Sequence, residues 1–118
     1  MELYEKRCEP CRGGVPPLTL EEQAPLLAAV DGWVVVDGHH LEKTWQFKDF
    51  ASALVFVNAV GAICEDQGHH ANFEFGWGEV LVRSWTHKID GLAEADFILA
   101  SRIDQIVSLN PPPGVLEC

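Results

Sequence analysis

Three histidines, His69, His70 and His87, are the residues whose type and spacing most clearly indicate chemistry in this chain of 118 residues. The adjacent pair follows a long apolar run, and the third closes the next β-like segment. Imidazole has an unperturbed pKa of about 6.5, so converging imidazoles make either a proton-transfer site or a metal site. The segment between them reads as one hairpin, which would return the chain and bring His87 toward the pair.

Proton chemistry fits this spacing better than metal binding does. Adjacent side chains point about 100° apart on a helix and to opposite faces of a strand, so neighbouring imidazoles converge poorly on one ion. They can instead flank a flat ligand, one giving a proton and another taking one. Each histidine alone also fits a solvated loop or a helix end, and His39-His40, after an Asp-Gly turn, is interpreted in that way.

Asp96 is the predicted partner of one of these imidazoles. It falls in the first turn of the last predicted helix, where the helix dipole favours a carboxylate. A carboxylate that accepts a bond from an imidazole N–H fixes the tautomer of the ring and raises its basicity. A plain acid at a helix start is the rival interpretation.

The four cysteines, Cys8, Cys11, Cys64 and Cys118, are predicted to be thiols. Cys8-x-x-Cys11 is half of a zinc-ribbon pattern, but no second CxxC follows, and no βαβ pattern surrounds it as around a redox pair. The pair is interpreted as part of a local N-terminal structure. A small metalloprotein that combines the cysteines with the histidines is the alternative.

Composition and charge indicate an acidic globular protein. Apolar residues make up 47% of the chain, and 18 Asp and Glu against 8 Lys and Arg give a formal charge of −10. This charge disfavours nucleic acids and anionic membranes as partners. The N-terminus lacks the apolar segment of a secretory signal, and no apolar run approaches the roughly 18 residues of a membrane span. A cytoplasmic protein is expected.

The predicted elements follow the order α-β-β-α-β-β-α within a single domain of residues 1–118. Residues 1–18 and 109–118 are expected to be an N-terminal flank and a C-terminal tail. Hairpins joined by helices predict an α+β fold, a four-stranded antiparallel sheet with three helices packed on one face. Helices are expected over residues 19–30, 49–67 and 93–108, and strands over 33–36, 40–47, 72–77 and 79–85.

Local signals set the ends of the first elements. Thr19 and Glu22 form a capping-box pattern at the start of the first helix. Pro25 inside it would cost about 3 kcal/mol, so the helix either kinks there or begins later than the box indicates. Asp37-Gly38 predicts a type I′ turn between the first two strands.

The second helix has the clearest pattern. Asp49 suits its start, and Gly68 suits the left-handed residue past its end. In the third helix, Ala93 occupies the capping position, so the first turn must find other partners. The apolar side of the second helix is predicted to hold Phe50, Ala53, Leu54, Val57, Gly61 and Cys64, widened by Phe56, Val60 and Ile63.

The chain resembles the pterin-4a-carbinolamine dehydratases, in particular their bacterial members. The resemblance extends from about residue 8 to residue 107, and its His-His…His…Asp spacing is specific. One departure is Ala71, where the family commonly has proline, and it removes no chemical group. The segments that carry the resemblance are residues 8–18, 47–50, 65–70, 85–88 and 91–97.

This resemblance implies dehydration of 4a-hydroxytetrahydropterin to quinonoid dihydropterin and water, the recycling of tetrahydrobiopterin, with no metal and no cofactor. A base must take the proton from N5, and an acid must protonate the leaving hydroxyl. By position, the implied catalytic residues are His69, His70, His87 and Asp96, and the implied substrate contacts are the three histidines with Ala71, Thr86, Lys88 and Ile89.

The resemblance also implies a homodimer or homotetramer. Vertebrate relatives act in addition as dimerisation cofactors for a transcription factor, and this role is not carried to so acidic a chain. The alternative to a dehydratase is a non-enzymatic binding or regulatory module on the same fold. A module that only binds would have no need of the histidines and Asp96.

Overall fold

The structure, a computed structural model, describes residues 2–9, 15–109 and 115–116. Its helices are α1 (Leu20–Leu27), α2 (Phe50–Gln67) and α3 (Glu94–Leu109), with short 3-10 turns η1 (Leu3–Glu5) and η2 (His87–Ile89). Its strands are β1 (Val34–Val36), β2 (His40–Phe47), β3 (Asn72–Gly76), β4 (Glu79–Ser84) and β5 (Val115–Leu116).

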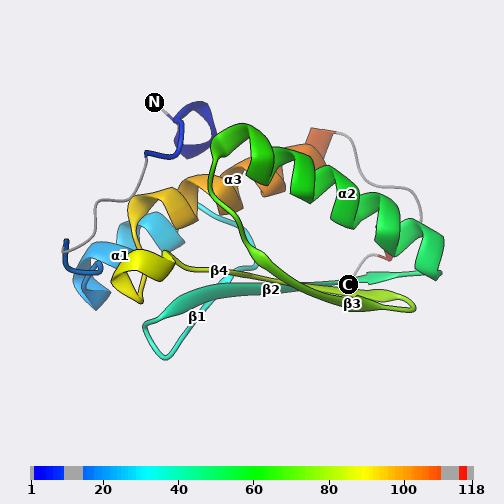
Figure 1. Cartoon of the computed structure of the whole chain (residues 1–118), viewed down its shortest axis with the longest axis horizontal. Coiled ribbons are helices and arrows are strands. Elements are labelled where there is room, and N and C mark those ends of the chain that lie inside the picture. The colour runs from blue at the N-terminus through cyan, green and yellow to red at the C-terminus, as the bar shows by residue number, and fades with distance from the viewer. Residues whose placement is uncertain (1, 10–14, 110–114, 117–118) are drawn as a thin grey trace.

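The strands form one antiparallel sheet in the order β1-β2-β4-β3, and the three helices cover one of its faces (Figure 1). This confirms the predicted α+β fold. The register of the central pair sets Leu41 opposite Ser84 and Trp45 opposite Val80. The two-residue β5 pairs with the end of β2 and was not predicted, because so short a strand has no periodicity to detect.

The core lies between the sheet and the helices. Alternate residues of β2, Leu41, Trp45 and Phe47, are buried beneath the helices, as the period of two predicted. Trp45 and Phe47 both contact Phe56 of α2, with ring centroids 4.7 and 5.3 Å apart. Each such side chain stabilises the fold by about 1.5–3 kcal/mol when fully buried.

The first helix begins where its capping box predicted. The Thr19 hydroxyl accepts a bond from the Glu22 N–H, and the Glu22 carboxylate accepts one from the Thr19 N–H. Pro25 lies inside the helix, so a later start is wrong. The helix ends at Leu27 rather than at residue 30, because the residues that follow form 3-10-type hydrogen bonds between positions three apart. One of these bonds runs from the Val30 N–H to the Leu27 carbonyl.

The second helix is capped as predicted, but the side that it buries differs from the predicted side. Asp49 accepts a bond from the Ser52 N–H, and Gly68 has φ +64° past the end. Phe50 and Leu54, expected in the core, are 42% and 40% exposed. Apolar residues nearly surround this helix, so their pattern could not say which side faces the sheet. The buried side holds Ser52, Ala53, Phe56, Val60, Cys64 and Gln67.

Part of the expected N-terminal flank belongs to the core. Leu3 is buried against the other core residues, and the Arg102 guanidinium of α3 donates two bonds, of 3.0 and 2.6 Å, to the Lys6 carbonyl. Cys11, Cys118 and the proline-rich residues 110–114 lie outside the described residues. Within the described part of the chain, the helices are too short or too polar to cross a membrane.

Candidate active site

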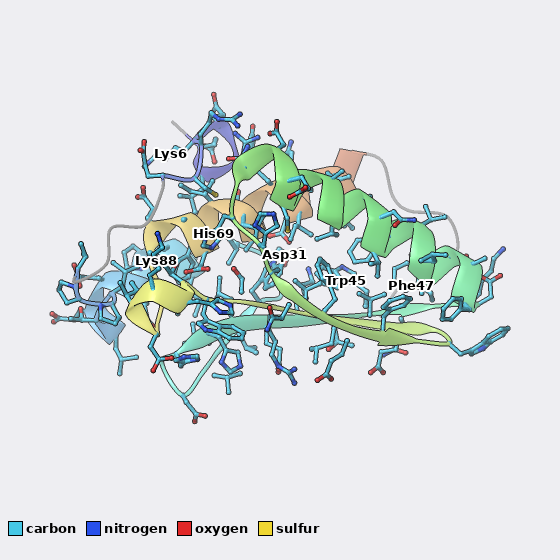
Figure 2. The ribbon with its side chains drawn as sticks, in the orientation of Figure 1. Lys6, Asp31, Trp45, Phe47, His69 and Lys88 are labelled. Atoms are coloured by element: carbon cyan, nitrogen blue, oxygen red, sulfur yellow. The ribbon has the colours of Figure 1, made fainter. Side chains whose placement is uncertain are left out.

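A pocket of about 470 Å³ is lined by all three predicted histidines, His69, His70 and His87. Thr86 and Lys88, two of the predicted substrate contacts, also line it. Figure 2 shows His69 and Lys88 toward the same end of the molecule, away from Phe47. The volume falls in the range of about 300–1,000 Å³ that is typical of small-molecule sites. The pocket is therefore large enough for a flat bicyclic ligand.

The two remaining predicted contacts lie elsewhere. Ala71 is half-buried against the core and does not line the pocket. Ile89 lines a second pocket of about 330 Å³, whose walls are mostly apolar. His69 and Thr86 line both pockets, so the two hollows adjoin at these side chains.

The turn after α2 brings the histidine pair to this pocket. Gly68 adopts the left-handed conformation, and the N–H groups of Gly68 and His69 both bond to the Cys64 carbonyl. These bonds end the helix and redirect the chain into β3. Because β3 and β4 form a tight hairpin, with Asn72 opposite Arg83, the chain returns and sets His87 beside the pair.

Asp96 organises the wall behind the pocket. Its carboxylate is fully buried and accepts bonds from the Ser84 hydroxyl (2.7 Å), the Thr86 hydroxyl (2.8 Å) and the Ala93 N–H (3.0 Å). The last bond is one half of a capping box, in which the carboxylate at the third helical position accepts the N–H of the capping residue. His69 Nε2 lies 2.7 Å from the same carboxylate. A buried carboxylate needs such partners, so Asp96 serves both as helix-start acid and as imidazole partner.

The bond to Asp96 determines the tautomer of His69. An ionised carboxylate only accepts hydrogen bonds, so His69 Nε2 must donate. The neutral ring then keeps its lone pair on Nδ1, which can accept a proton. The His69 side chain is only 13% exposed, so its ring is held by burial as well as by the bond.

His70 has a carboxylate partner that the sequence analysis missed. Its Nε2 lies 2.5 Å from the Glu65 carboxylate, in the last turn of α2. Both side chains are largely exposed, at 59% and 79%, so the pair adds little to stability. An acid in the last turn of the helix, five residues before His70, was the signal that could have indicated Glu65.

His87 is oriented by an aromatic ring. Its imidazole stacks on the Trp85 indole, with centroids 4.3 Å apart and an interplanar angle of 10°. Trp85 also lines the pocket, although it was not among the site residues predicted from the sequence. The period of two in an extended segment places residues 85 and 87 on one side, which was the available signal.

The metalloprotein alternative requires several ligating side chains that converge on one point. Among residues 2–9, 15–109 and 115–116, no group of three or more His, Cys, Asp or Glu side chains could hold an ion. Cys8 instead uses its backbone N–H to bond the Gln67 amide oxygen and its thiol to bond the Ala95 carbonyl. Cys11 lies outside the described residues, so metal analysis of the protein decides this alternative.

The Cys8 thiol is expected to resist alkylation at neutral pH. Burial, and then the nearby charge of Asp96, raise its pKa to about 11, so almost no thiolate is present at pH 7.5. Labelling by iodoacetamide in a Cys11→Ser background, followed by mass spectrometry, should be slow in the folded protein and accelerate as the pH rises toward 11. Unfolding in urea should restore ordinary reactivity. Equal labelling of Cys8 in the folded and unfolded chains would contradict this.

Comparison with known proteins points to one family. The family model described as pterin 4 alpha carbinolamine dehydratase matches residues 16–106. A Rubrobacter xylanophilus protein that carries the name pterin-4-alpha-carbinolamine dehydratase is 50% identical over 105 residues, which are 89% of this chain and 98% of that protein. A Methylococcus capsulatus protein of the same name is 45% identical, over 90% of this chain and 94% of its own.

Solved structures agree with this comparison. A crystal structure of a transcriptional coactivator/pterin dehydratase from Brucella melitensis superposes with a TM-score of 0.70 at 32% identity, over 76% of this chain and 97% of that one. A pterin dehydratase-like protein identified as a RuBisCO assembly factor in the alpha-carboxysome gives a TM-score of 0.53 at 26% identity, over 64% of this chain and 88% of that one.

Proposed function

This chain belongs to the pterin-4a-carbinolamine dehydratase family, a family of hydro-lyases, and we propose that it converts 4a-hydroxytetrahydropterin to quinonoid dihydropterin and water. The observation that carries the proposal is the set of three imidazoles on one pocket, with Asp96 bonded to the first of them. The proposed physiological role is recycling of tetrahydrobiopterin.

In the proposed reaction, a base removes the N5 proton while the 4a-hydroxyl leaves as water. The electron pair of the N5–H bond forms the C4a–N5 double bond, and the hydroxyl departs with a proton from an acid. Proton transfer by positioned side chains contributes typically about 10²–10⁴-fold to a rate. The chemistry therefore needs one proton acceptor and one proton donor on the pocket wall.

We assign the acceptor role to His70 and the donor role to His87. The bond from His70 to Glu65 leaves Nδ1 of His70 as the accepting nitrogen. His87 stacks on Trp85, an uncharged partner, and is exposed to solvent that can reprotonate it. His69, held by Asp96, orients the pterin and shares in the transfer.

An assay with purified protein tests the proposal directly. The loss of 4a-hydroxytetrahydropterin, followed by absorbance, is expected to be faster with the protein than in matched buffer. The intermediate also dehydrates unaided, so the rate must increase in proportion to protein concentration. Absence of any protein-dependent acceleration would refute the dehydratase function.

Metal removal is expected to leave this activity unchanged. The proposed acid and base are side chains alone, so no step depends on a bound ion. Dialysis against a chelator, with elemental analysis before and after, provides the measurement. Loss of activity that returns on addition of one metal would favour the metalloprotein alternative over proton chemistry by side chains.

A non-enzymatic module remains the second candidate. The likeness to a RuBisCO assembly factor favours it, because the name of that protein assigns an assembly role to a related fold. The three histidines and Asp96 favour the dehydratase instead. The protein-dependent rate described above separates the two, since a module that only binds would give none.

The homodimer or homotetramer implied by the resemblance is also a proposal. It is supported by the position of β3 at the edge of the described sheet, where backbone groups are available for pairing with another strand. Light scattering coupled to gel filtration measures the mass in solution. Cytoplasmic localisation, and the absence of nucleic-acid and membrane partners, likewise stay predictions.

A further inference from the structure

The other two histidines of the chain lie against the candidate site. His39 and His40 were interpreted from the sequence as solvated turn residues, and in the structure both are half-buried and make further contacts. Their rings lie 5.4 and 5.9 Å from the Trp85 ring, centroid to centroid. The type I′ turn is confirmed, with φ +53° at Asp37 and +65° at Gly38, and it carries the two rings to this position.

Trp85 therefore has aromatic neighbours on two sides. His87 stacks nearly parallel to it, and His39 and His40 approach it at interplanar angles of 43° and 54°. The two turn histidines also contact each other, with their Nδ1 atoms 3.1 Å apart. Only one of these two nitrogens can carry the hydrogen that lies between them. Burial, and then the charge of His39, lower the pKa of His40.

A second contact ties the same turn to the segment of His87. His39 Nε2 lies 2.8 Å from the carboxylate of Asp90, the residue that ends η2. Asp90 has φ +48°, and its N–H bonds to the His87 carbonyl at 3.2 Å. This bond links the backbone segment of His87 to the β1–β2 turn.

We infer that His39 and His40 are positioning residues that hold His87 through Trp85 and Asp90. His87 is exposed, so the surrounding structure confines its ring less than it confines His69. The aromatic contacts restrict the Trp85 indole on which His87 stacks. The bond from His39 to Asp90 restricts the backbone next to His87. The catalytic consequence rests on the proposed dehydratase function, but the positioning itself does not.

The primary test is the double variant His39→Ala/His40→Ala, measured without substrate by NMR of the His87 ring protons. Stacking at 4.3 Å on an indole displaces these signals upfield, and His87→Gln assigns them. The double variant is expected to move these signals downfield, toward their positions in an unstacked imidazole. The same variant is expected to lower kcat about tenfold, with a smaller change in KM, since misplaced catalytic groups lose rate.

Asp90 gives an independent test if the double variant fails to fold. Asp90→Gly removes the carboxylate at a backbone conformation that glycine adopts easily, whereas Asp90→Asn keeps an acceptor for His39. The glycine variant should move the His87 signals in the same direction as the double variant does. The asparagine variant should keep them near their positions in the parent protein. The other aspartate with positive φ, Asp37, lies in the β1–β2 turn, and Asp37→Asn is the matched control that should leave the signals and kcat unchanged.

The two proposals fail separately. His87 signals that stay in place in both the double variant and Asp90→Gly overturn the positioning role, whatever the activity. Signals that move in a protein without dehydratase activity support the positioning role and refute the proposed reaction.

Discussion

Replacement of His70 by alanine is expected to lower the protein-dependent dehydration rate by about 100-fold, the lower end of the range for a positioned acid or base. The variant removes the proposed N5 base and leaves Glu65 beside the pocket without its partner. Stability should change little, by about 0–1 kcal/mol, because the pair is exposed. Initial rates at several substrate concentrations, with buffer subtracted, provide the measurement.

Arg7→Ala is the matched control for this variant. Arg7 is an exposed cation that pairs with Asp66 at the same end of α2, and it lines neither of the two pockets described above. Its removal should leave kcat and KM unchanged. A His70→Ala protein that retains nearly the full rate would remove His70 from the mechanism and shift the base role to His69.

Replacement of Asp96 by alanine is expected to have the largest effect on stability, a loss of about 3–5 kcal/mol. The change leaves the buried hydroxyls of Ser84 and Thr86 and the Ala93 N–H without their acceptor, and each such group costs about 1–3 kcal/mol. The free energy of unfolding of a native protein is only about 5–15 kcal/mol in total. The melting temperature should therefore fall by roughly 10–20 °C.

The activity of this variant separates its two roles. His69 would lose its carboxylate partner, so the rate at a temperature where the protein stays folded should also fall. Asp96→Asn should be intermediate, because an amide offers one accepting oxygen while its NH₂ group meets donors. A variant as stable as the parent would show that the buried network contributes little.

Asp104→Ala is the control on the same helix. Asp104 accepts bonds from the Trp33 indole (2.8 Å) and the Asp31 N–H (2.9 Å), and it lies outside the pocket of the histidines. Its removal should cost about 1–2 kcal/mol, as for one or two partly buried hydrogen bonds. Its activity, once folded, should match that of the parent protein. Stability and activity are therefore expected to fall together only at Asp96.

The boundaries of several elements could be predicted because they depend on neighbours in the sequence. The capping box at Thr19, the cap at Asp49 and the left-handed Gly68 each involve bonds within a few residues. The Asp37-Gly38 turn is local in the same sense. Local bonds are encoded by spacing alone, so these assignments did not require knowledge of the fold.

The orientation of α2 and the partners of the site residues could not be predicted in this way. Phe50 and Leu54 fit an apolar stripe as well as Phe56 does, and only packing against the sheet selected the buried side. The turn of His39 is separated from Asp90 by three strands and a helix, so no spacing rule relates the two. Contacts between segments so far apart depend on the whole sheet.

By itself, the sequence determined the element order, the α+β class and the three imidazoles that could serve a proton-transfer site. Tertiary structure alone decided that Asp96 meets His69 and not another of the imidazoles. It also placed Trp85 between His87 and the β1–β2 turn. The physical reason is that residue type sets what a group can donate or accept, whereas its actual partner depends on how strands and helices pack around it.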